Sequence, residues 1–512
     1  MMALQEMPAR ISLRHLLTGL LDIEHDILVT APSLDARLVD DGGLFLAALG
    51  SQSHGLQYVE QALQRGVAVI VYDPAGGGDL LAAKIRKQSA VRLIELTDLT
   101  TKVSDIAARF YAQPSARLSV VGITGTNGKT SVSHFIAQAL NAEGDCAVIG
   151  TLGWGELSAL QQTINTTPDA VSVQAQLASF LQAGASTVAM EVSSHGLDQG
   201  RVKAVAFDGA VFTNLSHDHL DYHKNMAAYG QAKLALFQTP SLRFVVLNDD
   251  DDFSQTIRES LSAGVDIYSF SRRDNMAEKG CLFIANERLT KSGLSFDVTY
   301  AEETLCIKSA LFGLFNIDNL VATLAVLLAK GDGFAVAVNK VQQLVSVAGR
   351  MQLLSKTAKQ PSVLVDYAHT PDALKLALMS LREHCTGKLK LLFGCGGNRD
   401  QAKRALMGAI ASEYADEVII SNDNPRFESA EEIAAQIKAG AKDGACLTVE
   451  LDRAQAIEQL IVAAKNDDII LIAGKGHEVY QQVAGEEIPF SDAAVGLRAL
   501  QRRSASLLGD GQ

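Results

Sequence analysis

The sequence contains few cysteines, no long apolar run and no secretory signal, and each absence excludes a class of protein. Its six cysteines form no CxxC pair and no zinc-site spacing, so we expect reduced thiols rather than a disulfide framework. The most apolar stretch, near residues 320–329, is about half of the ~20 residues needed to span a bilayer. Glu6, Arg10 and Arg14 interrupt the segment where a signal peptide would place its apolar core. We therefore expect a cytoplasmic protein that does not insert into a membrane.

The charge pattern also argues against one kind of partner. Lysine and arginine together number 45 against 58 aspartates and glutamates, a net charge of −13, and no long basic run occurs. Proteins that bind nucleic acid concentrate Lys and Arg to neutralise phosphates, so we expect no nucleic acid partner. A local pocket can still hold an anionic substrate. With 47% apolar and 20% charged residues, the composition is that of a soluble globular enzyme.

What is present is a long alternation of strand and helix patterns. Short β-rich runs that end in Gly, Asp or Asn are followed by amphipathic helical patterns, which predicts an α/β fold with mainly parallel sheets. The length of 512 residues favours roughly three domains. Breaks in the pattern place these domains at residues 1–98, 99–348 and 349–512. Nearly every polar cluster of interest follows directly after a predicted strand, and ligands of open α/β sheets bind at these carboxyl ends.

Residues 118–131 predict a phosphate-binding loop. An apolar strand over 118–123 leads into a glycine-rich turn, and a helix begins near Lys129. Glycines let backbone N–H groups close around phosphate oxygens, and the helix start adds its positive dipole end. Lys129 can reach the β- and γ-phosphates of ATP, while the Thr130 hydroxyl can hold Mg²⁺. The loop is a variant, because Ile123 occupies the position where the usual pattern has its first glycine.

Two further polar features follow along the chain. Glu191 ends a predicted strand, and a carboxylate at that place beside a phosphate loop commonly holds the magnesium ion. Residues 214–223 then contain three histidines and two aspartates. Their density suggests a metal, but zinc favours other spacings and magnesium prefers oxygen ligands. The spacing alone leaves metal ligation and a polar active-site loop as equal alternatives.

Taken together, these motifs resemble those of the Mur ligases, which add amino acids to the peptide of the cell-wall precursor. In the family's order, the motifs occupy residues 125–131, 191–195, 214–221, 316–319, 349–351 and 366–369. The resemblance covers essentially the whole chain. It implies an N-terminal α/β domain that binds a uridine nucleotide, a central P-loop ATPase-like domain with a mainly parallel sheet, and a C-terminal Rossmann-like α/β domain that binds the amino acid.

The resemblance also implies the reaction. ATP phosphorylates a substrate carboxylate to an acyl phosphate, and an incoming amine then displaces phosphate, while Lys129 and magnesium stabilise the transferred phosphoryl group. By motif match, the catalytic residues are Lys129, Glu191, His219 and Lys233, and the metal ligands are Thr130, Glu191, His219 and Lys233 as a carbamate. Pattern alone predicts only a solvent-facing helix lysine at Lys233, whereas the resemblance predicts a carbamylated one. The ATP-binding residues that it implies are Gly125, Thr126, Asn127, Gly128, Lys129, Thr130, Ser131, Asn316, Asn319, Arg350, Asp366 and His369.

The third domain carries the motifs of the branch that adds meso-diaminopimelate to UDP-N-acetylmuramoyl-L-alanyl-D-glutamate. The non-reacting end of meso-diaminopimelate presents both a carboxylate and an ammonium group. Arg399 and Arg426 can make forked bonds to that carboxylate, and Glu478 can accept from the ammonium. L-lysine lacks the second carboxylate, and lysine-adding relatives generally lack the arginine that ends this motif. The alternative for Arg426 is a surface salt bridge after a turn. The diaminopimelate-binding residues implied are Arg399, Asp423, Asn424, Pro425, Arg426, Gly474 and Glu478.

The nucleotide-sugar substrate is expected across the first and second domains. By resemblance its contacts are Leu34, Ala36, Ser51, Gln52, Ser53, Asn165, Thr166, Thr167, Ser193, Gln199 and Arg201. The match is weakest in the first domain, where Ala36 stands at a position that is often serine in relatives. Any contact at Ala36 must therefore use its backbone.

Other functions stay open from the sequence. They are a lysine-adding Mur ligase, a folylpolyglutamate synthase-like ligase, and a P-loop module that switches with nucleotide and ligates nothing. The last of these predicts no use for residues 423–426 or Glu478. We also expect a monomer, and closure around residues 349–351 during the reaction.

Overall fold

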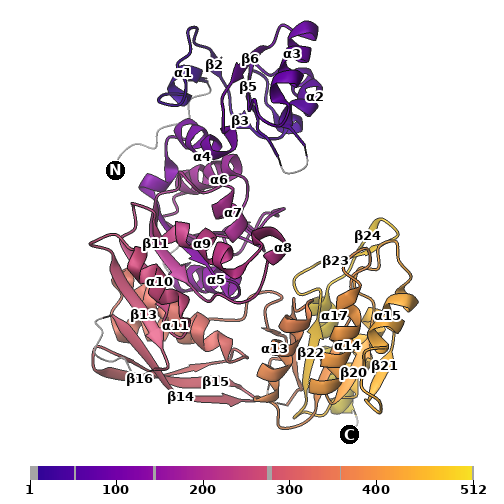
Figure 1. The fold of residues 1–512 in the computed structure, drawn as a ribbon. Coiled ribbons are helices and arrows are strands. Elements are labelled where there is room, and N and C mark those ends of the chain that lie inside the picture. The colour runs from indigo at the N-terminus through magenta and orange to yellow at the C-terminus, as the bar shows by residue number, and fades with distance from the viewer. Residues whose placement is uncertain (1–9, 51–52, 142–145, 274–279, 358, 510–512) are drawn as a thin grey trace. The chain divides into compact units, whose positions relative to one another are not determined.

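The computed structural model describes residues 10–50, 53–141, 146–273, 280–357 and 359–509 (Figure 1). The chain divides into two compact units, Met1–Ser269 and Phe270–Gln512. In these described ranges, no helix is both long enough and apolar enough to cross a membrane.

The first unit begins with a small parallel sheet in the order β3-β4-β5-β6 (Figure 1). Its strands are Pro32–Ser33, Leu44–Ala47, Val69–Tyr72 and Arg92–Glu95. β4 and β5 are apolar and buried along their whole length, because helices cover both faces of the sheet. One face packs against α2 (Val59–Gln64) and α3 (Gly78–Gln88). The other packs against α1 (Leu13–Leu16) and α4 (Leu99–Phe110), next to the antiparallel pair β1 (Ile11–Ser12) and β2 (Leu28–Val29).

The rest of the first unit is built on a larger sheet in the order β12-β11-β7-β10-β8-β9, parallel except for β9. In chain order its strands are β7 (Ser119–Thr124), β8 (Cys146–Gly150), β9 (Gly153–Gly155), β10 (Thr187–Glu191), β11 (Phe207–Phe212) and β12 (Phe244–Asn248). The helices are α5 (Lys129–Leu140), α6 (Ala170–Ala183), α7 (Ser194–Asp198), α8 (Leu220–His223), α9 (Met226–Phe237) and α10 (Phe253–Ser260). α6 and α9 share a core with this sheet, and α5 packs on β8 and β10.

The register of this sheet brings the ends of its strands to one edge. Glu191 of β10 pairs with Ile123 of β7, and Phe212 of β11 pairs with Thr124. The residues that follow β7 and β11, and the end of β10, therefore lie side by side. This edge is where ligands of parallel sheets bind.

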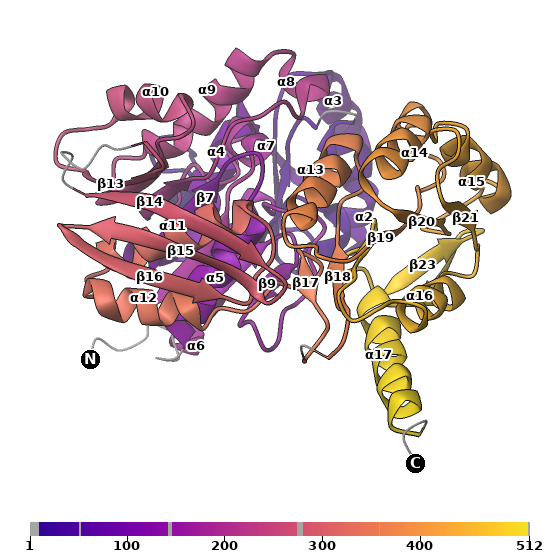
Figure 2. The same cartoon turned by 90° about the horizontal axis from the view of Figure 1, so that it is seen from below.

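The second unit begins with an antiparallel meander. β13 (Asp266–Ser271) carries the chain from the first unit into the second, and β14 (Cys281–Thr290), β15 (Gly293–Tyr300) and β16 (Glu303–Ser309) pair in sequence (Figure 2). Along β14 and β15 more buried side chains alternate with less buried ones, the pattern of a sheet with one solvated face. The helices α11 (Phe315–Ala329) and α12 (Phe334–Gln342) follow.

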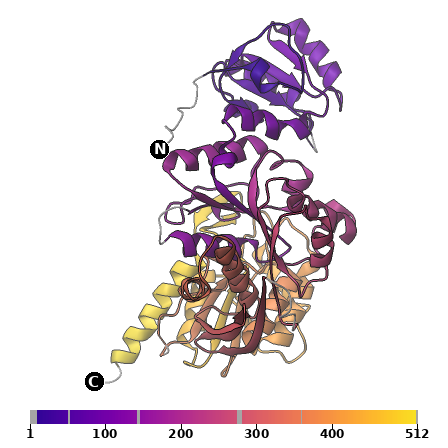
Figure 3. The ribbon, with the colours of Figure 1, turned by 90° about the vertical axis from the view of Figure 1, so that its left-hand side faces the viewer.

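The second unit ends in a sheet with helices on both faces. Its order is β17-β18-β22-β19-β20-β21, with strands Gln352–Leu353, Ser362–Asp366, Ile469–Ala473, Leu389–Phe393, Glu417–Ile420 and Leu447–Val449. All pairs are parallel except β17 with β18. One face holds α13 (Pro371–Arg382), α14 (Ala402–Tyr414) and α15 (Ala430–Lys438). The other holds α16 (Arg453–Val462) and α17 (Asp492–Gly509), the yellow helix that leads to the C-terminus in Figure 3.

The α/β class with mainly parallel sheets is confirmed. The structure adds two antiparallel elements that the alternating pattern did not predict, namely the meander β14–β16 and the hairpin of β23 (Tyr480–Val483) with β24 (Glu486–Pro489). The boundaries at residues 98 and 348 stay a prediction.

Candidate active site

The phosphate loop lies between β7 and α5 and depends on two glycines. Gly125 has φ +151°, and a Cβ there would stand 1.9 Å from Thr213 Oγ1. Gly128 has φ +88° at the N-cap of α5. Both positions would strain any other residue. The loop is held against the end of β11, because Thr126 N donates to Asn214 O over 2.8 Å and Asn127 N donates to Asn214 Oδ1 over 2.9 Å.

Two lysines meet at the start of this loop. Lys129 Nζ donates to the carbonyl oxygens of Gly125 and Thr126, each over 2.8 Å. Lys233, on α9, is 1% exposed, and its Nζ donates to Gly125 O over 2.9 Å. Its ammonium also lies 4.3 Å from the centre of the Tyr229 ring. The solvent-facing position predicted from pattern alone is wrong for Lys233, because α9 turns this side chain into the protein beside the phosphate loop.

Burial and the neighbouring positive charge act together on Lys233. Loss of solvent disfavours its ammonium form, and the charge of Lys129 disfavours it further, so the pKa of Lys233 lies well below its ordinary value; the carboxylate of Asp218 opposes this shift. A lysine with a depressed pKa reaches the neutral amine more readily. The neutral amine is the form that can react with carbon dioxide to give a carbamate.

Glu191 is fully buried at the end of β10 and collects hydroxyl and amide donors. Thr130 Oγ1 donates to its Oε2 over 3.0 Å. Thr151 donates its backbone N–H to Oε1 over 2.8 Å and its hydroxyl to Oε2 over 3.1 Å. Thr130 of α5 and Glu191 of β10, two residues of the predicted metal site, are therefore in direct contact.

The oxygen donors of this site fit magnesium. Thr130 and Glu191 supply a hydroxyl and a carboxylate, the ligand types that Mg²⁺ takes in proteins, usually together with substrate phosphates and water. Within the part of the chain that the structure describes, no group of three or more His, Cys, Asp or Glu side chains is arranged to hold a metal alone. The donor set therefore suits a metal that shares its shell with a nucleotide.

His219 lies in a cluster of aromatic rings after β11. It has φ +53° and caps α8, its side chain is about half exposed, and its Nε2 is 3.5 Å from Asp218 Oδ2. Its ring centre is 5.0 Å from that of His195. Burial and the neighbouring imidazoles lower the pKa of His195. The metal-ligand role of His219 stays a prediction.

The predicted substrate loop joins Glu191 through short polar contacts. Thr151 Oγ1 is 3.0 Å from Thr166 Oγ1, and Thr167 Oγ1 donates to the Glu191 carbonyl over 3.0 Å. Ser193 N donates to Thr167 Oγ1 over 2.9 Å.

Arg201 holds the other side of this loop. Its Nη1 donates to Thr167 O over 2.6 Å, and its Nε and Nη2 donate to Gln199 Oε1 over 2.9 and 2.6 Å. Thr166, Thr167, Ser193, Gln199 and Arg201 thus form one network, which Asn165 borders as an exposed residue.

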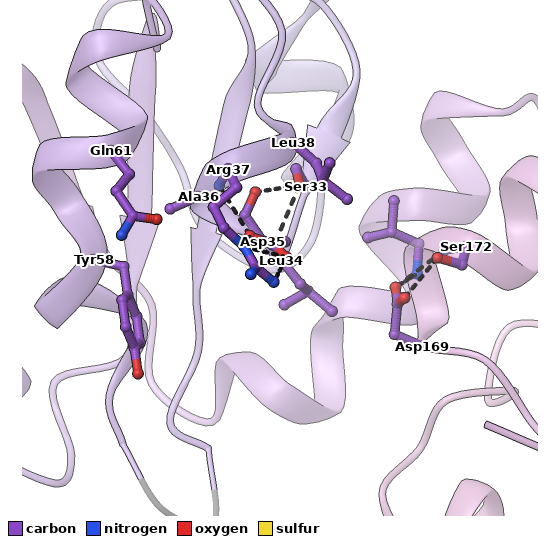
Figure 4. A pocket seen from close by; sticks show the side chains of 11 residues that line it. Ser33, Leu34, Asp35, Ala36, Arg37, Leu38, Tyr58, Gln61, Asp169 and Ser172 are labelled. Atoms are coloured by element: carbon purple, nitrogen blue, oxygen red, sulfur yellow. Dashed lines mark hydrogen bonds and ion pairs between the residues drawn. The ribbon is translucent and has the colours of Figure 1, made fainter. Parts of the chain in front are cut away.

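Two of the residues predicted for the uridine end border a cavity of about 510 Å³ (Figure 4). Leu34 and Ala36 line it, with Tyr58 on one side of them and Asp169 on the other. Ser53 Oγ lies 3.3 Å from the Tyr58 hydroxyl. Ala36 is buried, which agrees with a contact through its backbone. Ser51 and Gln52 lie outside the described residues.

The remaining ATP-binding residues that were predicted lie in the second unit. On α11, Asn316 and Asn319 are buried and joined by a 2.9 Å hydrogen bond. The Arg350 guanidinium lies 4.8 Å from the centre of the Tyr367 ring. Asp366 ends β18 and accepts from Met351 N over 2.7 Å, and burial raises the pKa of its carboxyl.

His369 follows β18 in the same loop as Asp366. Its Nδ1 lies 2.8 Å from the carbonyl oxygen of Tyr367. β18 therefore presents both residues at its carboxyl end.

The main cluster of the predicted amino-acid site forms where β20 and β22 end. Asn424 Nδ2 donates to Glu478 Oε2 over 2.9 Å, and the buried Lys475 donates to Glu478 Oε2 over 2.8 Å and to Asn424 Oδ1 over 2.9 Å. Gly474 has φ +111°, and a Cβ there would lie 2.7 Å from Asp423 Oδ2. Two strand ends thus converge on one polar cluster.

The two arginines of this site differ in their surroundings. Arg426 is partly buried, with Nη1 donating to Gly397 O over 2.7 Å and Nε donating to Gln482 Oε1 over 3.0 Å. It forms no surface salt bridge, so that alternative is wrong for the described chain. Arg399 is exposed after β19. Pro425 is buried between Asn424 and Arg426.

Sequence reasoning missed three residues of these sites. Thr151 follows β8, so the rule that polar residues gather after strands could have found it. Lys475 lies within a motif that was recognised but was not singled out. Gln482 belongs to the hairpin β23–β24, and no sequence signal placed that hairpin beside Arg426.

Comparison with known proteins identifies the family. A family model described as the Mur ligase middle domain matches residues 123–327, and one described as the Mur ligase glutamate ligase domain matches residues 349–476. The Pseudomonas aeruginosa protein named UDP-N-acetylmuramoyl-L-alanyl-D-glutamate–2,6-diaminopimelate ligase is 45% identical over 478 residues, covering 93% of this chain and 96% of that protein. The Coxiella burnetii protein of the same name is 43% identical over 477 residues, again covering 93% and 96%.

A solved structure agrees with these relatives. It is described as UDP-N-acetylmuramoyl-L-alanyl-D-glutamate–2,6-diaminopimelate ligase, is 32% identical, and superposes with a TM-score of 0.71 over 97% of this chain and 99% of its own. The motifs of the phosphate loop, the strand ends of both sheets and these full-length similarities point to one family. This chain belongs to the Mur ligase family.

Proposed function

We propose that this chain is an ATP-dependent ligase of peptidoglycan precursor synthesis. It joins an amino group of meso-2,6-diaminopimelate to the D-glutamate side-chain carboxylate of UDP-N-acetylmuramoyl-L-alanyl-D-glutamate and releases ADP and phosphate. Relatives that are 42–45% identical over nearly the whole chain carry the name of this reaction. The chain's own residues supply a physical reason for each step.

The first step is phosphoryl transfer from ATP to the substrate carboxylate. The N-terminus of α5, which begins directly after Gly128, offers backbone N–H groups to the phosphates. Lys129 adds a positive charge where negative charge develops on the transferred group. A carboxylate oxygen attacks the γ-phosphorus, ADP leaves, and an acyl phosphate results. Thr166 and Arg201 border the place where this carboxylate must enter.

Magnesium is the cation that this donor set suits. Thr130 and Glu191 would hold it, with Lys233 as a carbamate and His219 as further ligands, and when bound it neutralises phosphate charge. The contacts of Thr151 hold the Glu191 carboxylate in one orientation whether or not a cation is present.

The second step is attack by the amine of the acceptor on the acyl carbon, with loss of phosphate and of one proton from the amine. Selectivity for the acceptor rests on Arg426 and Glu478, and the arrangement of donors around the Glu478 carboxylate is the observation that carries this proposal. Glu478 Oε2 is taken by Lys475 and Asn424, and in the described chain no donor contacts Oε1. Oε1 can therefore accept from the ammonium of the non-reacting end.

The carboxylate of that same end matches Arg426. A guanidinium that faces no carboxylate loses a charge-assisted hydrogen bond, which is worth about 1.5–3 kcal/mol, or roughly 10- to 150-fold in selectivity. L-lysine offers no such carboxylate, so it should be the poorer acceptor.

The test is phosphate release by the purified protein with ATP, Mg²⁺ and the UDP-linked dipeptide. With meso-diaminopimelate we expect a kcat/KM at least about tenfold higher than with L-lysine. Arg426→Lys should raise the KM for diaminopimelate and leave the KM for ATP within about twofold, because lysine cannot make a forked bond. The exposed Arg498→Lys serves as the control and should behave as the parent. Preference for lysine would show that the acceptor is wrongly assigned.

The proposal includes a monomeric enzyme in the cytoplasm. Light scattering on the purified protein measures its molecular mass, and the mass of a dimer would contradict the proposed monomer.

A further inference from the structure

The hairpin β23–β24 lies against the loop of residues 423–426 and extends it as a short parallel bridge. Arg426 bridges Val483, with Arg426 N donating to Gln482 O over 3.0 Å and Ala484 N donating to Arg426 O over 2.6 Å. Gln481 Nε2 also donates to Asp423 O over 3.0 Å. The loop that carries the acceptor-site residues is therefore fixed by the hairpin and not only by the end of β20.

This contact holds Arg426 in an unusual backbone conformation. Arg426 has φ +53°, a left-handed region that costs a non-glycine residue free energy unless the surroundings enforce it. The backbone N–H and C=O of Arg426 both form hydrogen bonds with the hairpin, and these bonds stabilise the left-handed conformation. The direction in which the side chain leaves the backbone is thus set by β23.

Gln482 is the residue of the hairpin that contacts both Asn424 and Arg426. Its backbone N–H donates to Asn424 Oδ1 over 2.9 Å. Its Oε1 accepts from Arg426 Nε over 3.0 Å, and its Nε2 donates to Glu487 Oε1 over 3.3 Å. Because arginine only donates, the amide oxygen of Gln482 must face Arg426. Glu487 stabilises the same orientation, because its carboxylate accepts from the amide nitrogen.

These contacts determine which part of the guanidinium is left for a ligand. Arginine has five N–H groups. Gln482 takes the one on Nε and Gly397 takes one on Nη1. In the described chain Nη2 has no acceptor, so one N–H of Nη2 and the second N–H of Nη1 are left for a forked pair of bonds to a carboxylate.

We propose that Gln482 is a positioning residue for Arg426 and, with Glu487 behind it, determines selectivity for an acceptor that carries a second carboxylate. This inference rests on the proposed function, since it names what aims the acceptor-binding arginine. Gln482 does not itself touch the substrate. It acts by holding the guanidinium rotamer and by occupying Nε with a neutral acceptor instead of a charged one.

Two substitutions separate this role from simple support of the fold. Gln482→Met keeps the length of the side chain and removes its acceptor. Gln482→Glu keeps an acceptor but places a negative charge on the arginine, where it competes with the substrate carboxylate and repels Glu487. We expect both to raise the KM for meso-diaminopimelate by about tenfold or more, with kcat and the KM for ATP within about threefold of the parent. The preference for diaminopimelate over L-lysine should fall by a similar factor.

Matched controls use the same hairpin and the same arginine. Glu486→Gln removes an exposed charge four residues along and should leave the kinetics unchanged. In the Arg426→Lys background, Gln482→Met should raise the KM for diaminopimelate by less than about twofold further, because the guanidinium that Gln482 positions is gone. Glu487→Gln can still accept a hydrogen bond from the Gln482 amide, so it should raise the KM for diaminopimelate less than Gln482→Met does.

The outcomes distinguish the inference from the proposed function. If Gln482→Met leaves the KM for diaminopimelate unchanged while the protein stays folded by thermal unfolding, the positioning role is wrong. Gln482→Met could instead raise the KM for diaminopimelate by the same factor in the parent and in Arg426→Lys, or raise the KM for ATP in parallel. Either result would mean a structural role for Gln482 and would also overturn the positioning role. If the parent enzyme shows no diaminopimelate-dependent phosphate release, the proposed function fails first and the inference fails with it.

Discussion

The carbonyl oxygen of Gly125 accepts hydrogen bonds from both Lys129 and Lys233, over 2.8 and 2.9 Å. Two ammonium groups are thereby brought to one oxygen at the mouth of the phosphate loop. Under the proposed function, Lys129 acts as a cation on the phosphates of ATP. Lys233 is the buried member of the pair, so it is the one whose charge is disfavoured.

Replacement of Lys233 by Met should abolish activity and yet make the folded protein more stable at neutral pH. Burial lowers the pKa of Lys233 below the ordinary value of 10.5, so between the two pKa values the unfolded chain binds one proton more than the folded chain. The unfolding free energy of the parent therefore rises with pH through this window and falls as pH decreases. Met has no such proton, so its stabilising effect should be largest at neutral pH and shrink toward pH 10.5.

Urea unfolding at neutral and alkaline pH, in buffer free of carbon dioxide, measures this effect. The exposed Lys87→Met is the control and should leave the pH slope as in the parent. Phosphate release by Lys233→Met should fall by about 100-fold or more, because the carbamate ligand is lost. A pH slope identical in Lys233→Met and the parent would contradict the depressed pKa.

The Thr130 hydroxyl should matter for magnesium more than for folding. Thr130→Val keeps the shape and removes the donor to Glu191, leaving a buried carboxylate with one hydrogen bond fewer, a loss of about 1–3 kcal/mol in unfolding free energy. Because a metal ligand is lost as well, the Mg²⁺ concentration for half-maximal phosphate release should rise about tenfold or more. Thr130→Ser retains the hydroxyl, so its unfolding free energy and its magnesium dependence should both stay close to those of the parent. An unchanged magnesium dependence in Thr130→Val would remove Thr130 from the metal site.

The sequence predicted the strand ends well because the strands of parallel sheets are continuous apolar runs. Glu191 ends such a run in the sheet of the first unit, and Asp366 and Asp423 end or follow such runs in the last sheet of the second unit. Within each sheet, the register of parallel strands brings the strand ends to one edge. The burial of Lys233 was harder to predict. Its spacing of four residues from Tyr229 and from Phe237 places it on a buried stripe of α9, but an apolar stripe does not say what covers it.

The hairpin β23–β24 could not be predicted from pattern. Its strands are partly or fully exposed and mostly polar, so no apolar run identifies them. The contacts that place it, from Gln482 to Asn424 and Arg426, join residues far apart in the sequence. Recognition of Arg426 came instead from the resemblance of its motif, which names a residue without showing what orients it.

Tyr58 should contribute to binding of the uridine end of the substrate. Its ring is about half exposed and lines the cavity that Leu34 and Ala36 also border, so a base can lie on its face (Figure 4). Stacking of a base on an aromatic ring is worth about 1–3 kcal/mol, so Tyr58→Ala should raise the KM for the UDP-linked substrate roughly 5- to 150-fold. Tyr58→Phe keeps the ring and loses only the 3.3 Å contact with Ser53, so its KM should stay within about threefold. Neither change should alter the KM for diaminopimelate, because the residues proposed to bind it belong to another unit. Because the ring acts by stacking, UDP should compete with the substrate in Tyr58→Phe as in the parent and more weakly in Tyr58→Ala. Equal inhibition by UDP in all three proteins would place the base elsewhere.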